Sequence, residues 1–170
     1  MSNNVYNFGA GPATLPSSVI EQVKSNLQDF DNGMSIMEVS HRSSAFKDYA
    51  DQSEASIRKL LNMSDDYAVL FLQGGATFQF SMVPQNLSEW LPNKKYQING
   101  SANYLITGGW SKKAADYAKF HTSVNTVYDS SENSYTSVID IKDWNINPDV
   151  DYFYYCANET VHGLEIHETP

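Results

Sequence analysis

The feature that most constrains this chain is a continuous apolar run followed directly by two glycines. Residues 67–73 are Tyr-Ala-Val-Leu-Phe-Leu-Gln, and Gly74 and Gly75 come next. Such a run of aromatic and branched residues is typical of a strand buried on both faces of a sheet. The mostly apolar residues after the glycines predict a short helix that Pro84 limits. The chain is therefore expected to pass from a buried strand into a helix through the two glycines.

This order of strand, glycines and helix predicts a seat for a phosphate or another anion. Because Gly74 and Gly75 have no Cβ atom, a ligand can approach the main chain closely, and the free N–H groups of the first helical turn point at it. The Thr77 hydroxyl can donate to the same anion, and the helix dipole favours negative charge there. Two glycines after a strand are also common in ordinary turns, so this motif alone favours the two interpretations about equally.

Composition narrows the class of protein. The 170 residues have the length of one domain, and 41% hydrophobic residues are enough to bury a core. A formal net charge of −9 argues against a nucleic acid or an anionic membrane as a partner. The start of the chain does not resemble a signal peptide, and no apolar stretch is long enough to span a bilayer, so a cytoplasmic location is expected. The single cysteine, Cys156, lies in an apolar run and is expected to be a buried, inert thiol without a catalytic role.

Helices are expected in the first third of the chain, after an extended loop over residues 7–12. The first is predicted to begin with a capping box formed by Ser18 and Glu21, and the Asp-Asn-Gly sequence at 31–33 ends it. Residues 34–42 are expected to be a loop or a short strand. A longer helix, capped by Ser43 or Ser44, then extends to about residue 61, and this helix is expected to turn one face to the core and the other to water.

The order of strand, two glycines and helix occurs a second time, with a strand at 103–107, glycines at 108 and 109, and a helix at 110–118 that Ser111 helps to cap. Two further strands are predicted, at 121–129 and 152–157. The segments between the elements are expected to be a solvated loop (86–103), a mobile polar stretch (130–144) and a turn region (145–151). Alternating strands and helices predict an α/β fold with a mostly parallel sheet flanked by helices, whose ligand lies at the carboxyl ends of the strands.

Three loops are expected to meet at that edge of the sheet: residues 74–77, 108–110 and 158–160. Trp110 begins a helix there, where an indole can lie against a flat ring or close the sheet edge, and position alone favours packing. Thr160 taken alone is typical of a turn hydroxyl that bonds to the backbone. Only its position beside the other two loops favours contact with a ligand.

No metal site is expected from the histidines at 121, 162 and 167 with Glu165. In a strand, residues 162 and 167 would lie on opposite faces, and the chain has no closely spaced helical pair of histidines.

Five ordered blocks of this sequence resemble the phosphoserine aminotransferase family. The sharpest is Met37-Glu-Val-Ser-His-Arg42, and together the blocks cover nearly the whole chain. The blocks are residues 7–16, 35–42, 69–80, 107–114 and 158–163.

The resemblance implies part of the large domain of a fold type I pyridoxal-phosphate transferase, preceded by an extended N-terminal segment. Residues 1–170 would then hold the N-terminal arm and the first portion of the cofactor-binding domain. Members of this family transfer an amino group between glutamate and 3-phosphohydroxypyruvate, giving phosphoserine and 2-oxoglutarate, in serine and pyridoxine biosynthesis. They act as homodimers with a shared active site.

Site residues are implied position by position. Gly75, Ala76 and Thr77 would hold the phosphate of pyridoxal 5'-phosphate, Trp110 would stack on its pyridine ring, and Thr160 would hydrogen-bond near the ring hydroxyl. One branch of the family has arginine where Thr77 stands, so this chain resembles the other branch.

The resemblance also implies substrate contacts. His41 and Arg42 would bind the distal anion of the substrate in the partner subunit's site, where a guanidinium suits carboxylate and phosphate equally. The alternative for Arg42 is a surface ion pair. One branch of the family has serine where Ala10 stands, so a substrate contact at residue 10 could be made only through the backbone.

The family's Schiff-base lysine, and the aspartate that pairs with the pyridine nitrogen, are expected to lie beyond Pro170. No catalytic residue is therefore assigned within these 170 residues, and alone they are expected to be inactive and unstable as a monomer. The alternative is a noncatalytic module that binds an anion or another protein.

Overall fold

The computed structural model describes residues 5–9, 11–88 and 100–170, which fall into two compact units, Met1–Phe71 and Leu72–Pro170. Most of the loop predicted over 86–103 lies outside the described residues. No helix in the described ranges is long and apolar enough to span a membrane.

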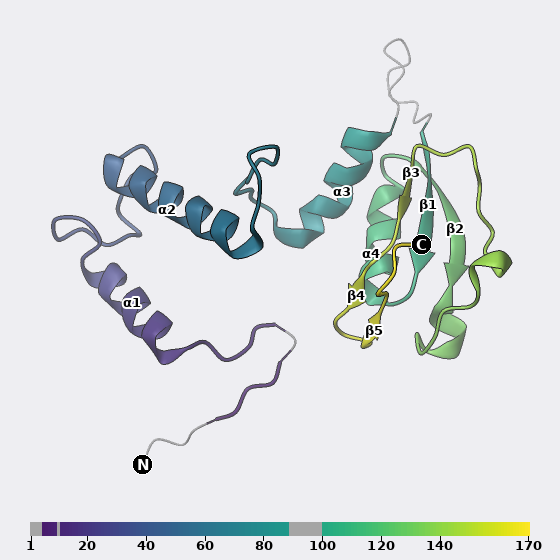
Figure 1. Ribbon diagram of the computed structural model, residues 1–170, viewed down its shortest axis with the longest axis horizontal. Coiled ribbons are helices and arrows are strands. Elements are labelled where there is room, and N and C mark those ends of the chain that lie inside the picture. Colours follow the sequence, from purple (N-terminus) through teal and green to yellow (C-terminus); the bar gives the residue numbers. More distant parts are fainter. Residues whose placement is uncertain (1–4, 10, 89–99) are drawn as a thin grey trace, which may run out of the picture. The chain divides into compact units, whose positions relative to one another are not determined.

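The first unit holds two helices, α1 (Ser17–Gln28) and α2 (Ser44–Leu61), joined by turns (Figure 1). The predicted cap of α2 is confirmed, because Ser43 Oγ accepts a hydrogen bond from the Phe46 N–H at 3.2 Å. The predicted capping box of α1 is wrong. Pro16 is the N-cap residue, so Ser18 already lies inside the helix, and Glu21 pairs with Lys24 instead.

The turn after α1 forms as predicted. Asn32 and Gly33 both have positive φ, at 51° and 85°, and the Phe30 N–H donates to the Met34 carbonyl at 2.7 Å. Residues 34–42 form turns, in agreement with the loop alternative.

No residue of α1 or α2 is fully buried, which contradicts the expectation that α2 turns one face to a core. Val23 is 50% exposed and Leu27 is 44% exposed. The aromatic pair of Phe30 and Tyr49, with ring centroids 5.4 Å apart, is one of the contacts inside the unit. Two helices without a third layer cannot enclose their apolar stripes.

The strand predicted over residues 67–73 is also wrong. This segment has no regular secondary structure and forms no ladder with any described strand, and Leu70 and Phe71 are 70% and 62% exposed. An apolar run indicates that the segment tends to be buried. It forms a strand only where a neighbouring strand pairs with its backbone N–H and C=O groups.

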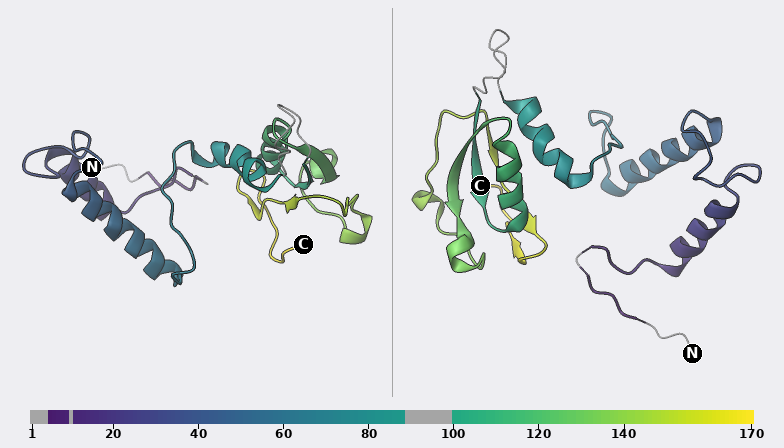
Figure 2. Two further views of the ribbon diagram at one scale, coloured as in Figure 1. Left: turned by 90° about the horizontal axis from the view of Figure 1, so that it is seen from above. Right: turned by 180° about the vertical axis from the view of Figure 1, so that it is seen from behind.

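The second unit contains a parallel three-stranded sheet in the order β2 (Ser123–Asp129), β1 (Ser101–Ile106) and β3 (Tyr152–Tyr154). Helix α4 (Gly109–Ala118) packs on this sheet, and α3 (Gly75–Leu87) packs on α4 (Figures 1 and 2). The predicted parallel α/β arrangement is therefore confirmed. A short antiparallel hairpin, β4 (Asn158–Glu159) and β5 (Leu164–Glu165), was not anticipated.

Two segments differ from their predicted form. The prediction that Pro84 limits helix α3 is wrong, because the helix continues to Leu87. A proline lacks one N–H donor, but the Pro84 carbonyl still accepts from the Ser88 N–H at 3.0 Å. The polar stretch 130–144 contains two turns of 3₁₀ helix, η1 (Ser130–Asn133) and η2 (Ile141–Asp143).

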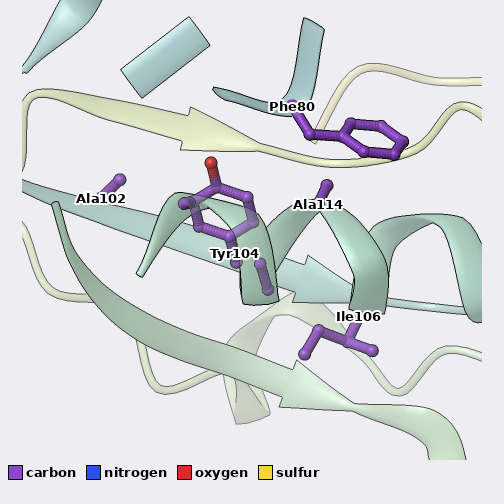
Figure 3. Close-up of a cluster of buried hydrophobic side chains, with 7 residues drawn as sticks. Phe80, Ala102, Tyr104, Ile106 and Ala114 are labelled. Atoms are coloured by element: carbon purple, nitrogen blue, oxygen red, sulfur yellow. The ribbon is translucent and has the colours of Figure 1, made fainter. Parts of the chain in front are cut away.

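The core of the second unit lies where β1 meets α4. Figure 3 shows Tyr104 and Ile106 of β1 with Ala114 of α4, and Phe80 of α3 completes the cluster. The alanines of α4 let the helix approach the sheet closely. This packing fixes the N-terminal end of α4 relative to the carboxyl ends of β1 and β3.

Three tyrosines of this core make the unit sensitive to alkaline pH. Tyr104 is fully buried, stacks on Tyr154 at 4.8 Å between ring centroids, and its hydroxyl lies 2.8 Å from that of Tyr152. Burial raises the pKa of Tyr104, and burial followed by nearby negative charge raises the pKa of Tyr154 to about 12.

We expect the free energy of unfolding to fall as the pH rises above about 10. The unfolded chain releases the phenol proton near pH 10, whereas the folded chain holds that of Tyr154 to about pH 12. The stabilisation is complete at pH values below the pKa of the phenol in the unfolded chain. It is lost as the pH rises toward the pKa of the phenol in the folded chain, and the free energy of unfolding falls by roughly 1.4 kcal/mol per pH unit for each phenol. Urea unfolding between pH 8 and 11 measures this slope. Tyr154→Phe should flatten it, and an unchanged slope in that variant would contradict the assignment.

Candidate functional site

The second unit has a pocket of about 260 Å³ at the carboxyl ends of β1 and β3, beside the N-terminus of α3. Three residues that were predicted to meet here from three separate loops line the pocket: Ala76, Trp110 and Thr160. The complete lining is Ala76, Phe80, Trp110, Tyr154, Cys156, Asn158 and Thr160.

The N-terminus of α3 has free backbone donors. Gly74 is the N-cap residue with φ 95°, and no side chain caps the helix. The N–H groups of Gly75, Ala76 and Thr77 meet no acceptor among the described residues. A Cβ atom at Gly75 would meet nothing within 4 Å, so the space over the first turn is open. Unpaired backbone donors at the start of a helix are the groups that bind anions in many proteins.

The N-terminus of α4 is different, although it follows the same strand and glycine pattern. The Trp110 and Ser111 N–H groups donate to the two carboxylate oxygens of Glu159, at 2.9 and 2.8 Å. The Gly109 N–H donates to His162 Nδ1 at 3.2 Å. These side chains occupy the donors that an external anion would need. Of the two predicted turns, only the one at α3 is open to a ligand.

Ser111 completes the closed end of α4. Its hydroxyl oxygen accepts from the Thr107 N–H at 2.8 Å and from the Gly108 N–H at 3.1 Å. The predicted capping role of Ser111 is confirmed.

Trp110 lies at the pocket surface and not in the core. It is 37% exposed, and its indole Nε1–H donates to Thr160 Oγ1 at 3.0 Å. The packing role that position alone favoured for Trp110 is therefore not observed, and Thr160 bonds to a side chain instead of the backbone. Because the Thr160 oxygen accepts from the indole, its own hydroxyl hydrogen is free for a ligand.

Lys113 is a basic residue of this region that the sequence argument missed. Its Nζ donates to Thr77 Oγ1 at 3.3 Å and lies 5.8 Å from the centroid of the Trp110 ring. Its spacing of three residues from Trp110 on one helix places both side chains on the same face, and that spacing could have identified it. The contact also leaves the Thr77 hydroxyl hydrogen free to donate.

Comparison with known proteins decides the family. The model of the aminotransferase class-V family matches residues 5–170. The chain belongs to the class-V aminotransferase family. Its relatives include the phosphoserine aminotransferase of Nitrosomonas europaea, 45% identical over 98% of this chain, and that of the Arabidopsis thaliana chloroplast, 38% identical over 98%. The chain spans 43% and 37% of the length of these two relatives.

Solved structures agree with this class-V assignment. A pyridoxal-phosphate-bound phosphoserine aminotransferase from Trichomonas vaginalis superposes with a TM-score of 0.83 at 34% identity, over 98% of this chain and 48% of its own. A phosphoserine aminotransferase structure concerned with radiation damage of the Schiff base gives a TM-score of 0.82 at 36% identity, over 98% and 44%.

In this class-V aminotransferase chain, Cys156 is half-buried and lines the pocket, so the expectation of a fully buried thiol is wrong. Burial, and then the negative charge of Glu159, raise the pKa of the Cys156 thiol. The thiol is therefore protonated at neutral pH and is a poor nucleophile.

The predicted substrate residues belong to the first unit. His41 and Arg42 are exposed in the turn before α2, and the Arg42 N–H donates to Ser40 Oγ at 3.2 Å. The guanidinium of Arg42 forms no ion pair with a described carboxylate, so the surface ion pair is not observed. Ala10 lies outside the described residues.

The prediction that His162 lies in a strand is wrong. His162 lies in the turn between β4 and β5 and not in a strand, and its Nδ1 accepts from Gly109. Within the described part of the chain, no group of three potential ligands comes together.

Proposed function

We propose that the complete protein containing this chain is a phosphoserine aminotransferase that transfers an amino group between glutamate and 3-phosphohydroxypyruvate with pyridoxal 5'-phosphate. The observation that carries the proposal is the pocket lined by Ala76, Trp110 and Thr160 beside the open N-terminus of α3. Family membership and relatives that bear this name support it.

The residues present fit a phosphorylated aromatic ring. The free N–H groups of Gly75, Ala76 and Thr77 would hold the phosphate, and Lys113, which contacts the Thr77 hydroxyl, adds positive charge next to it. The Trp110 indole would lie against the ring, and the Thr160 hydroxyl would donate to its oxygen. The pocket has a volume of about 260 Å³.

Each protein group has a separate task in this proposal. Pyridoxal phosphate, when bound, supplies the electron-withdrawing ring and reactive carbonyl carbon that amino transfer requires. The α3 amides would hold the phosphate, while Trp110 and Thr160 would orient the ring. Phe80 and Tyr154 present apolar surface that excludes water from one side of the pocket.

The substrate would be held by its distal anion. His41 and Arg42 present two donors from one turn, and a guanidinium can bind a carboxylate or a phosphate through two parallel hydrogen bonds. A contact at Ala10 would use only its backbone. We further propose that the protein is a homodimer in which His41, Arg42 and Ala10 serve the partner's site. Residues 1–170 would form the N-terminal arm and the first portion of the large domain. The complete enzyme would act in the cytoplasm, in serine and pyridoxine biosynthesis.

The direct test is to purify the complete protein and measure pyridoxal phosphate binding by visible absorbance. We expect a stoichiometric complex and amino transfer from phosphoserine to 2-oxoglutarate. Cofactor binding with transfer from another amino donor, but none from phosphoserine, would show that the substrate is wrong.

A noncatalytic anion-binding module makes a different prediction in the same assay. It would bind inorganic phosphate saturably at the α3 amides but would transfer no amino group from any donor. Phosphate binding without turnover would therefore replace the enzyme proposal with this alternative.

A further inference from the structure

Two consecutive residues hold Trp110 at its two ends. Glu159 accepts the backbone N–H of Trp110, and Thr160 accepts its indole N–H. The main chain and the side chain of one residue are thus fixed by neighbouring positions of strand β4 and the turn that follows it. No other residue lining the pocket is fixed in this way among the described contacts.

The Glu159 carboxylate is built into the structure as a fixed group. It is 0% exposed, and each of its oxygens accepts one backbone N–H of α4. Burial of a carboxylate is unfavourable unless hydrogen bonds and positive potential compensate it, and the first turn of a helix supplies both. A Cβ atom at Gly108 would overlap this carboxylate, so the carboxylate lies directly against the backbone of the turn.

The shape of the pocket depends on this arrangement because Trp110 is the residue of α4 that lines the pocket. The carboxylate fixes the first turn of α4, which sets the Cα–Cβ direction of Trp110, and the Thr160 bond then selects the rotation of the indole. If the first turn shifts, the indole and the Thr160 hydroxyl separate. The Thr160 hydroxyl is then no longer oriented by the indole, and the flat surface of Trp110 is displaced at the same time.

We propose that Glu159 is a positioning residue that sets the indole of Trp110 against the bound ring. It acts through the first turn of α4 and touches neither cofactor nor substrate. The effect on cofactor affinity rests on the proposed function, whereas the effect on the orientation of Trp110 does not.

The test compares Glu159→Gln with the wild type in the complete protein. The amide oxygen can accept one N–H of α4, but the amide nitrogen then faces the other, so one donor is left unpaired. We expect the Kd for pyridoxal phosphate to rise about tenfold. The matched control is Glu165→Gln, which removes the same charge from the exposed neighbouring strand β5 and should leave the Kd unchanged.

A double-mutant cycle separates positioning from general stability. In a Trp110→Ala background, Glu159→Gln should change the Kd less than about twofold, because the residue through which Glu159 acts is absent. An equal rise in both backgrounds would overturn the proposal, as would an unchanged Kd in the single variant. If Glu159→Gln does not fold, Glu159→Asp replaces it. Aspartate keeps the negative charge but has a shorter side chain, and its effect on the Kd is compared in the same two backgrounds.

A readout that needs no cofactor distinguishes the two proposals. The indole N–H resonance of Trp110 should shift in Glu159→Gln, and the amides of Trp110 and Ser111 should exchange faster with solvent. If the wild type fails to bind pyridoxal phosphate, the proposed function is wrong while this readout still decides the role of Glu159. An unchanged indole resonance would overturn the positioning role whatever the cofactor does.

Discussion

Replacing Arg42 with alanine in the complete protein is expected to weaken glutamate and phosphoserine together, by roughly 2–5 kcal/mol in kcat/KM for each. The side chain is proposed to bind the distal anion that the two substrates share, and removing it leaves that anion desolvated and unpaired. The affinity for pyridoxal phosphate should stay the same, because the proposed cofactor residues are Gly75 to Thr77, Trp110 and Thr160. Steady-state kinetics with both substrates and a cofactor titration measure the two effects.

The surroundings of Arg42 make this variant informative. Its side chain is exposed and has no ion pair with a described carboxylate, so alanine should change the free energy of unfolding by less than about 0.5 kcal/mol. Lys59→Ala removes the same charge from the exposed end of α2 and is the matched control. If both variants retain wild-type constants, Arg42 does not bind substrate. Loss of only one substrate would show that the two anions are bound at different places.

Local chemistry predicted the helices well because their determinants lie within a few residues. The Ser43 hydroxyl caps α2, and the Asn32–Gly33 turn follows α1 with the positive φ angles that these residues tolerate. The errors arise where one local rule competes with another. Ser18 and Glu21 have capping-box spacing, but Pro16 begins the helix earlier, since proline is favoured at helix starts.

Burial and strand pairing could not be predicted in the same way. Residues 67–73 have the composition of a buried strand, yet they meet no ladder partner in the described part of the chain. The apolar face of α1 is exposed and that of α2 is only half-buried for a related reason. Sequence periodicity shows which face is apolar, but only packing partners decide whether it is covered.

The convergence at the pocket followed from topology alone. Parallel strands end at the same edge of a sheet, so Trp110 after β1 and Thr160 after β3 had to lie near each other. The role of Glu159 did not follow, because it depends on register. Tyr104 pairs with Tyr154, which brings the residues after each strand level with one another and places the carboxylate under the first turn of α4.

Gly108→Ala is the substitution we expect to be most damaging to stability, at a cost of roughly 3–5 kcal/mol in the free energy of unfolding. The added Cβ atom would overlap the Glu159 carboxylate, whose atoms are fully buried and cannot move into solvent. Relief of the overlap requires the carboxylate to leave the Trp110 and Ser111 N–H groups, so the cost combines overpacking with two lost charge-assisted hydrogen bonds. Urea unfolding of the complete protein measures it.

The neighbouring glycine is the matched control. A Cβ atom at Gly109 would lie 3.2 Å from Cε1 of His162, and this exposed ring needs only a small shift to make room while it keeps its hydrogen bond to the Gly109 N–H, so Gly109→Ala should be nearly neutral. Removing the obstructing carboxylate tests the cause directly: in a Glu159→Ala background, Gly108→Ala should cost less than about 1 kcal/mol. An equal cost in both backgrounds would mean that residue 108 is restricted by its backbone and not by Glu159. A large cost at Gly109 would instead show that the whole turn, and not the carboxylate alone, rejects a side chain.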